Sequence, residues 1–542
     1  MNRYFARMML LVMLGWTAVA CSHGSVVQPT AQSQVMPDNY SRVAVDTMSA
    51  LAAYFPDQTS MAVFASYGSV VETIRALDHW NVVDGNALHQ TLSDLGTHYR
   101  LDPSRLKSFY EAGFHTAKGW GLGLLGRHVV LALQTDDSDK VLAWINHVVT
   151  EEFGRPETVH EKSDGWKFYH VRAMDKAIVT VMQKDGMTLM MWNGDTQKAA
   201  MELVRAIADG RTLDKVIDGE ALKRNFRTAS VLAVIPGKAA LPDFVLPENL
   251  RQWGEAIAKS AALGVTLNEE TASVRLAMTL HADHPMVADL QSLEGGTLGV
   301  WTKPILHTEP QVAARAKINP EALIRLALKQ APVSYQNQWK ALMSKLNNRL
   351  LGIHFEQQVV QNFAGSIWVA LHDVREDVFQ GQPWWLALLE QDVHVYLPMA
   401  DAGLAAKFFG KLSFLKQFVP PDKAAIDTDD GILHAVVRFD KNIHVSYADG
   451  LLGVTTDAGW NRMKGLYASP DQKDMASNVL MDSANDLAAQ GKFAPVMSLV
   501  QGICGGRCEV GDDLTHIADK FDFRVMLDGD SVVAEVGLER GR

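Results

Sequence analysis

The sequence predicts an α+β protein with two homologous domains from an internal duplication, each an antiparallel β meander with packed helices. Three turn dipeptides recur in the same order about 265 residues apart, which is typical of a tandem duplication. They are Asp164-Gly165, Asp175-Lys176 and Asp185-Gly186, then Asp430-Gly431, Asp440-Lys441 and Asp449-Gly450. Asp-Gly accepts positive φ angles and joins antiparallel strands tightly. The alternation of strands and helices with such hairpins favours antiparallel sheets over a parallel doubly wound fold.

The length of 542 residues is too great for one hydrophobic core. An amino-terminal signal, a polar stretch without periodicity and the two repeats predict four parts. They are a lipoprotein signal peptide (1–20), a flexible tether (21–39), a first α+β repeat domain (40–288) and a second α+β repeat domain (289–542).

In the first repeat, apolar residues at helical or alternating spacing predict the elements. A first helix is expected over 40–54, because Val43, Met48, Leu51 and Tyr54 share one helical face and Pro56 ends it. Strands are expected at 61–67, 119–134 (a hairpin), 158–192 (the meander), 231–235 and 263–280 (a hairpin turning at 268–270), and helices up to 109, at 139–149 and at 196–207.

The second repeat follows the same order. The expected elements are a strand at 297–301, a helix from Pro320, strands at 366–371 and 393–397, a helix at 404–414, the meander, a strand at 479–481 and a hairpin at 521–538. The segment 375–389 has no counterpart in the first repeat.

The amino terminus predicts an exported lipoprotein. Arg3 and Arg7 precede a short apolar core, which is too short for a membrane span and typical of an export signal. The ending Val19-Ala20-Cys21 is similar to the lipobox of bacterial lipoproteins. That resemblance implies cleavage before Cys21 and acylation of it, and Ser22 implies sorting to the outer membrane. An ordinary secretory signal that contains a cysteine is the alternative.

Composition excludes some partners. The net charge is −11 and no stretch is densely basic, whereas nucleic-acid binding requires clustered Lys and Arg. The apolar fraction of 47% and the charged fraction of 21% are those of a folded, soluble protein. The expected partners are therefore a membrane reached through the lipid anchor and an envelope protein or apolar ligand.

Two short motifs match enzyme signatures by letter. Gly121 to Gly126 reads G-x-G-x-x-G, but a strand-like stretch follows it, where a dinucleotide site needs a helix. A hairpin that bends or packs closely at its glycines is the preferred interpretation. Ser104-x-x-Lys107 and Ser413-x-x-Lys416 match S-x-x-K, but the chain has no Lys-Thr-Gly element, which penicillin-interacting enzymes require.

Two clusters resemble metal sites and are better explained otherwise. The stretch 281–284 (His-Ala-Asp-His) lacks a further ligand at a suggestive spacing, so a solvated loop is expected. Met187, Met190 and Met191 correspond to aliphatic residues in the second repeat, which predicts core packing rather than a soft-metal site. No metal or other cofactor is expected.

Cys504 and Cys508 are expected to form a disulfide. After export the compartment is oxidising, and the intervening Gly505-Gly506 permits the tight turn of so short a ring. A redox-active pair is the alternative, but the spacing is not C-x-x-C and no thioredoxin-like context surrounds it.

Trp384 and Trp385 lie in the segment 375–389 that only the second repeat has. Such added loops often carry function. The segment is interpreted either as an extra strand that buries a tryptophan on each face, or as an exposed patch offered to a partner or to lipid.

The whole arrangement resembles duplicated bacterial envelope proteins known only as domains of unknown function, in order and spacing rather than in a motif. The resemblance brings no active-site residues. We therefore expect a non-catalytic lipoprotein of the outer membrane, facing the periplasm, that acts as a binding or scaffold protein. A carrier or chaperone for an apolar envelope molecule is the alternative, and an enzyme is not expected because no nucleophile with an adjacent base is visible.

Overall fold

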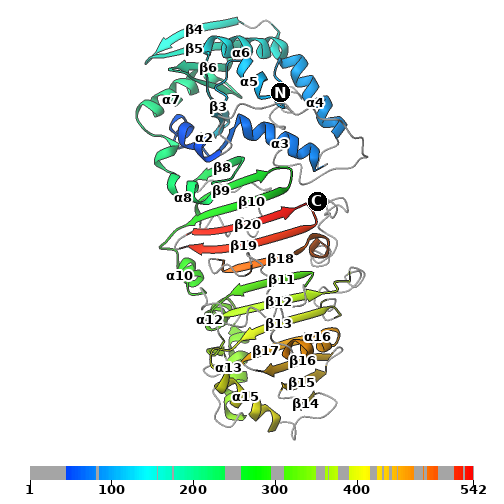
Figure 1. Cartoon of the computed structure of the whole chain (residues 1–542). Helices are drawn as coiled ribbons and strands as arrows, with labels where there is room; N and C mark the ends of the chain where they lie inside the picture. Colours follow the sequence, from blue (N-terminus) through cyan, green and yellow to red (C-terminus); the bar gives the residue numbers. More distant parts are fainter. Residues whose placement is uncertain are drawn as a thin grey trace. The chain divides into compact units, whose positions relative to one another are not determined.

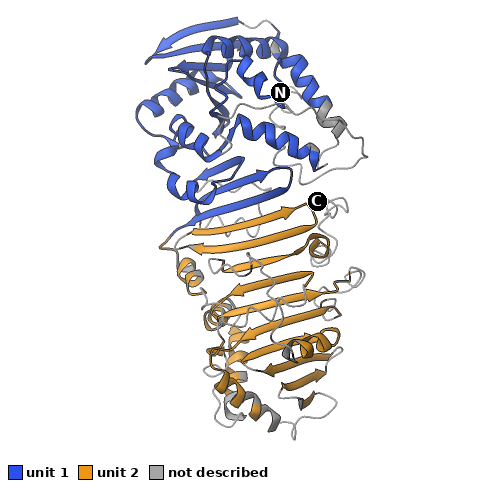
Figure 2. Cartoon of the chain, in the orientation of Figure 1, with its two compact units in different colours: residues 1–281 blue, residues 282–542 orange. Residues whose placement is uncertain are grey.

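The computed structural model divides the chain into two compact units, residues 1–281 and 282–542 (Figures 1 and 2). The structure describes residues 44–80, 85–154, 157–173, 176–237, 258–293, 310–331, 333–349, 360–363, 365–375, 388, 390–414, 424–429, 432–438, 442–448, 450–468, 480, 485–497, 518–528 and 531–540.

Unit 1 contains one antiparallel sheet. Along the sheet the strand order is β4-β5-β6-β7-β3-β2-β1-β8-β9-β10. The strands are β1 (Met61–Ser66), β2 (Gly119–Leu125), β3 (His128–Gln134), β4 (Glu157–Ser163), β5 (Trp166–Ala173), β6 (Lys176–Lys184), β7 (Met187–Trp192), β8 (Val231–Pro236), β9 (Ala258–Leu267) and β10 (Thr271–Leu280).

The predicted Asp-Gly hairpins of unit 1 are confirmed. Asp164 and Gly165 join β4 to β5 with φ angles of 53° and 80°. Asp185 and Gly186 join β6 to β7 with φ angles of 48° and 75°. Two successive positive φ angles match the twist of the flanking strands, which explains why Asp-Gly occupies both turns.

The glycine-rich stretch is a hairpin, as preferred above. β2 runs antiparallel to β3, and Gly126, at a φ of 57°, lies in the two-residue turn between them. A Cβ at Gly121 would lie 2.9 Å from the Phe55 ring, and one at Gly123 would lie 2.6 Å from it. These glycines therefore let an aromatic ring pack closely against the strand, which is a structural role.

Helices cover the sheet of unit 1 and close its core. The helical elements are α2 (Ala44–Leu51), η1 (Ala52–Tyr54), α3 (Tyr67–His79), α4 (Gly85–Tyr99), α5 (Leu106–Glu111), α6 (Ser138–Phe153), α7 (Thr196–Ala208), η2 (Leu213–Lys215) and α8 (Gly219–Asn225). The side chain of Asp137 caps α6 by accepting from the amides of Asp139 and Lys140.

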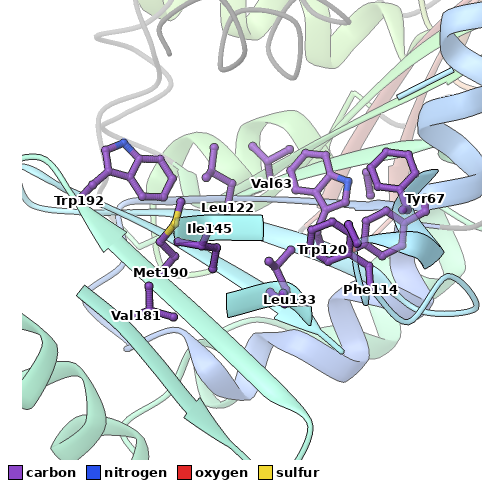
Figure 3. Packing of buried hydrophobic residues seen from close by; sticks show 14 of the residues in the cluster. Val63, Tyr67, Phe114, Trp120, Leu122, Leu133, Ile145, Val181, Met190 and Trp192 are labelled. Atoms are coloured by element: carbon purple, nitrogen blue, oxygen red, sulfur yellow. The ribbon is translucent and has the colours of Figure 1, made fainter. Parts of the chain in front are cut away.

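The core of unit 1 is continuous and apolar. Trp120 and Leu122 of β2 and Met190 of β7 are buried in it, and Ile145 of α6 packs onto the same cluster (Figure 3). Met187 and Met191 are buried as well, so the predicted core role of the three methionines is confirmed.

Unit 2 contains an antiparallel sheet with the strand order β14-β15-β16-β17-β13-β12-β11-β18-β19-β20. Its strands are β11 (Val312–Lys317), β12 (Ser366–His372), β13 (Asp392–Pro398), β14 (Ala424–Asp429), β15 (Ile432–Arg438), β16 (Asn442–Ala448), β17 (Leu451–Thr456), β18 (Leu487–Lys492), β19 (Lys520–Asp528) and β20 (Ser531–Glu539). The helices are α10 (Pro285–Gln291), α12 (Pro320–Gln330), α13 (Val333–Arg349), α15 (Ala402–Phe414) and α16 (Asp457–Ala468).

The predicted α+β class is wrong, because the protein is mostly β. In the described residues, strands outweigh helices, and within each unit every strand belongs to one continuous antiparallel sheet. The prediction of two homologous α+β domains is thus replaced by two mostly-β units with a common strand order. The sequence analysis underestimated the strand content because it missed strands such as β11 (Val-Ala-Ala-Arg-Ala-Lys) and β18 (Leu-Ala-Ala-Gln-Gly-Lys), which are rich in residues of low strand propensity.

Candidate functional site

The two units differ in how they connect equivalent strands. In unit 1 the two residues Gly126 and Arg127 join β2 to β3. In unit 2 the corresponding connection, from β12 to β13, runs from Asp373 to Gln391. The Gln391 side chain closes the base of this connection, since its Oε1 accepts from the Arg375 amide at 2.8 Å and its Nε2 donates to the Arg375 carbonyl at 3.0 Å.

An open pocket of about 470 Å³ lies at the base of this connection. Residues of the connection, of β13 and of α16 line it, and most of them are charged. The lining residues are Asp373, Arg375, Glu390, Asp392, Ala458, Asn461 and Arg462.

Arg462 of α16 lies between two carboxylates of this pocket. Its Nε donates to Asp392 Oδ2 at 2.8 Å, and one of its terminal nitrogens donates to Asp373 Oδ2 at 2.9 Å. The Asp392 side chain is 8% exposed, whereas the Asp373 side chain is 78% exposed. Arg462 therefore holds a buried partner on one side and a solvated partner on the other.

A buried hydrogen-bond chain continues from Asp392 into the sheet. His394 Nε2 lies 2.6 Å from Asp392 Oδ1, and His394 Nδ1 lies 3.1 Å from the Tyr396 hydroxyl. Burial opposes ionisation of Asp392, but the hydrogen bonds from His394 and Arg462 outweigh it and lower the pKa of the carboxyl. Because an ionised carboxylate only accepts, His394 carries a proton on Nε2 and donates it to Asp392.

Gly459 allows α16 to approach this chain. A Cβ at Gly459 would contact Thr455 Oγ1, and it would lie 2.7 Å from Asp392 Oδ1 and 2.9 Å from His394 Nε2. The helix therefore rests directly on the polar groups of the sheet, and only glycine fits at this position.

His372 borders the same network. It is 3% exposed, and its ring lies edge-on to His394 with the centroids 5.1 Å apart. Burial, followed by repulsion from His394 and Arg462, lowers the pKa of His372 to about 4. His372 is therefore neutral at pH 7.

A second histidine network anchors the amino-terminal end of α16. His444 Nε2 lies 2.6 Å from Asp457 Oδ1, and His444 Nδ1 lies 2.9 Å from His434 Nε2. The two imidazoles are nearly parallel, at an interplanar angle of 6°, and the Trp460 ring stacks on His434 at a centroid distance of 3.7 Å. Burial opposes ionisation of Asp457, but the hydrogen bonds from His444 and Asn442 lower its pKa below the ordinary value.

The buried polar chain is a feature of unit 2. β3 and β13 hold the same place in their sheets, with Gln134 opposite Met187 and Pro398 opposite Leu451 at the equivalent ends. Two residues before these ends, Ala132 of unit 1 is equivalent to Tyr396 of unit 2. Four residues before them, Val130 is equivalent to His394. Ala132 and Val130 are both buried. Unit 1 therefore has an apolar core where unit 2 has the hydrogen-bonded chain.

The predicted site residues are not brought together in the described part of the chain. Cys21, Trp384, Trp385, Cys504 and Cys508 lie outside the described residues. Asp283 lies exposed in a turn, and His281 precedes that turn and is partly exposed. Ser104 hydrogen-bonds to Asp102 rather than to a lysine.

The sequence analysis missed Asp392, His394 and Arg462. A signal was present, since Asp392, His394 and Tyr396 alternate with Val393 and Val395. Polar residues at every second position of an apolar strand place a polar row on one face.

Comparisons with known proteins do not assign the chain to a family. Neither the protein-family models nor the curated proteins include a match. Among solved structures, crystal form I of TP0453 matches with a TM-score of 0.25 at 9% identity over 44% of this chain and 82% of that chain. Crystal form III matches with a TM-score of 0.25 at 8% identity over 46% and 88%, and crystal form IV with 0.24 at 9% over 42% and 79%. Among the described helices, none is long and apolar enough to cross a membrane.

Proposed function

We propose that the protein is a non-catalytic binding protein, anchored through lipidated Cys21 to the outer membrane and facing the periplasm, and that unit 2 binds its ligand. The observation that carries the binding role is the open, charged pocket beneath α16. The pocket lies at the base of a connection that unit 1 replaces with two residues, as expected when a binding site is added to a fold at a loop.

The anchoring part of the proposal is supported by the residues around Cys21. Basic residues, a short apolar core and small residues before the cysteine form the pattern of an exported lipoprotein. Several acyl chains on one residue give stable membrane attachment, where a single chain is marginal.

Binding without catalysis is supported by the state of the histidines near the pocket. A general base needs a ring nitrogen that can reach the substrate. The His394 ring is fully buried, so neither of its nitrogens reaches a molecule in the pocket. His372 and His444 are buried as well.

The lining also bears on the choice of ligand. A carrier of an apolar molecule would enclose it in apolar side chains. The pocket beneath α16 instead presents arginine and carboxylate groups, so it suits a polar ligand.

The test is capture from envelope extract by the full-length, lipid-anchored protein. We expect it to retain a molecule that the Arg375→Gln variant loses, while Arg325→Gln, a change of an exposed arginine of α12, keeps it. Cys21→Ser should release the protein from the membrane and remove the acyl mass. Equal capture by the wild type and the Arg375→Gln variant would refute binding in this pocket, and a Cys21→Ser protein that stays on the outer membrane would refute the anchor.

A further inference from the structure

We infer that the pocket binds a phosphate or carboxylate group, which displaces Asp373 from Arg462 and is shared between Arg462 and Arg375. This inference rests on the proposed binding function and adds the chemical class of the ligand. In the free protein, Asp373 occupies the position of the ligand's anionic group.

The two ion pairs of Arg462 differ in how easily they can be exchanged. Asp392 is 8% exposed and is fixed in place by His394, so separating it from Arg462 would deprive a buried carboxylate of its arginine partner. Asp373 is 78% exposed, and ion pairs of such exposed groups contribute only about 0–1 kcal/mol. An incoming anion can therefore replace Asp373, which water then solvates, while Asp392 keeps the guanidinium in place.

Arg375 supplies the second cationic group. Its side chain is 57% exposed, and a terminal nitrogen lies 3.7 Å from Glu390 Oε2, which is longer than a hydrogen bond. Its backbone, by contrast, is fixed by the paired hydrogen bonds to Gln391. Arg375 thus has a defined position and a loosely held charge, and arginine binds phosphate and carboxylate oxygens in a planar, two-pronged geometry.

The same exposures argue against a cationic ligand. The exposed Asp373 gives a cation only one carboxylate, and a second would have to be drawn from Asp392 or Glu390, whose side chains are only 8% and 28% exposed. The arginine left behind would be partly buried, since the Arg462 side chain is 32% exposed. An anion that displaces only Asp373 reaches Arg462 and the exposed Arg375 without these costs, so the anion is the favoured ligand.

The pocket is larger than one anionic group. A volume of about 470 Å³ lies in the range of sites for small organic molecules, so the phosphate or carboxylate is expected to be one end of a larger ligand. Asn461 offers an amide at the same wall. A soluble phosphate ester and a phospholipid headgroup share this chemistry, and the experiment separates them.

Calorimetry measures the binding of glycerol phosphate to the full-length protein in detergent. Vesicle flotation then compares the amount of protein bound to phosphatidylglycerol vesicles with the amount bound to phosphatidylcholine vesicles. Arg375→Gln should weaken glycerol phosphate binding about tenfold, as expected for one charge-assisted hydrogen bond. Asp373→Asn should strengthen it about two- to fivefold, because it removes the competing carboxylate. The asparagine is well tolerated there, since residue 373 has a φ of 47° and Asn accepts such angles.

The sign of the Asp373→Asn effect decides the inference. Weaker or unchanged binding of glycerol phosphate would overturn it, because removal of a carboxylate that competes with the anion must tighten binding. Glycerol phosphate binding without vesicle binding assigns a soluble ligand, and binding to phosphatidylglycerol vesicles that Arg375→Gln reduces assigns a headgroup. If capture from the extract depends on Arg375 but glycerol phosphate does not compete with the captured molecule, the ligand class is wrong and the proposed binding function stands.

Discussion

Substitution of Gly459 by alanine should loosen α16 from the sheet. The added methyl group would meet Thr455 Oγ1, and it would lie 2.7 Å from Asp392 Oδ1 and 2.9 Å from His394 Nε2. These atoms belong to short, buried side chains and cannot give way without breaking the hydrogen bond between Asp392 and His394. The helix must therefore shift, which also displaces Arg462 from the pocket.

The magnitude follows from two opposing effects. Overpacking of a well-packed site costs about 1–3 kcal/mol. Alanine in place of glycine inside a helix contributes about 0.5–1 kcal/mol in the other direction. The net expectation is a loss of about 1–2 kcal/mol in the free energy of unfolding of unit 2.

The matched control is Gly465→Ala in the same helix, where an added Cβ would meet nothing within 4 Å. This variant should gain about 0.5–1 kcal/mol from helix propensity alone. Urea denaturation followed by circular dichroism gives the stabilities, and hydrogen exchange of the α16 amides shows whether the loss is local. If Gly459→Ala proves as stable as Gly465→Ala, then α16 does not rest on the Asp392–His394 pair as described.

Three further predictions concern pH and the residues outside the described part of the chain. The pKa of His372 is lowered to about 4, so between pH 6.5 and 4 the unfolded state binds more protons than the folded state. Unit 2 should therefore lose about 1.4 kcal/mol of stability per pH unit as pH falls through that window. His372→Gln should flatten this pH profile of stability, measured by denaturation. Intact mass before and after reduction should show one disulfide between Cys504 and Cys508, whereas two free thiols in envelope-purified protein would contradict it. If Trp384 and Trp385 are core residues, their replacement by alanine should cost about 3–5 kcal/mol of stability each and lower the melting temperature by many degrees. If they form a contact surface, the replacement should reduce partner capture or membrane association and leave stability unchanged. A variant that is stable and fully competent would exclude both interpretations.

Several turns, hairpins and helix ends could be predicted because local chemistry determines them. The Asp-Gly turns require positive φ, and the alternating residues of β2 and β3 mark a hairpin without reference to distant parts of the chain. The helix α12 begins at Pro320, the residue that marked its start in the sequence, and the Asn319 side chain caps it.

The class and the site could not be predicted, because both depend on pairings across the chain. β11 joins β12 to β18, and its small, polar-containing sequence becomes a strand only because two neighbours supply hydrogen bonds on both sides. Arg462 meets Asp392 across 70 residues of sequence, and no spacing rule connects them. The alternation around His394 was the only local trace of the site, and a polar row in a strand equally describes a solvated face.

The central position of the first strand in each sheet has a consequence for folding. β1 lies between β2 and β8, with Phe64 opposite both Gly121 and Leu232, and β11 lies between β12 and β18, with Arg315 opposite both Trp368 and Ala488. Neither sheet can close until a loop of more than 150 residues has been drawn together, and such long closures slow folding. During synthesis from the amino terminus, β1 lacks β8 and β11 lacks β18 until most of each unit has been made. We therefore expect each sheet to remain incomplete until late in synthesis. Such delay is compatible with the export across a membrane that the proposed lipoprotein requires.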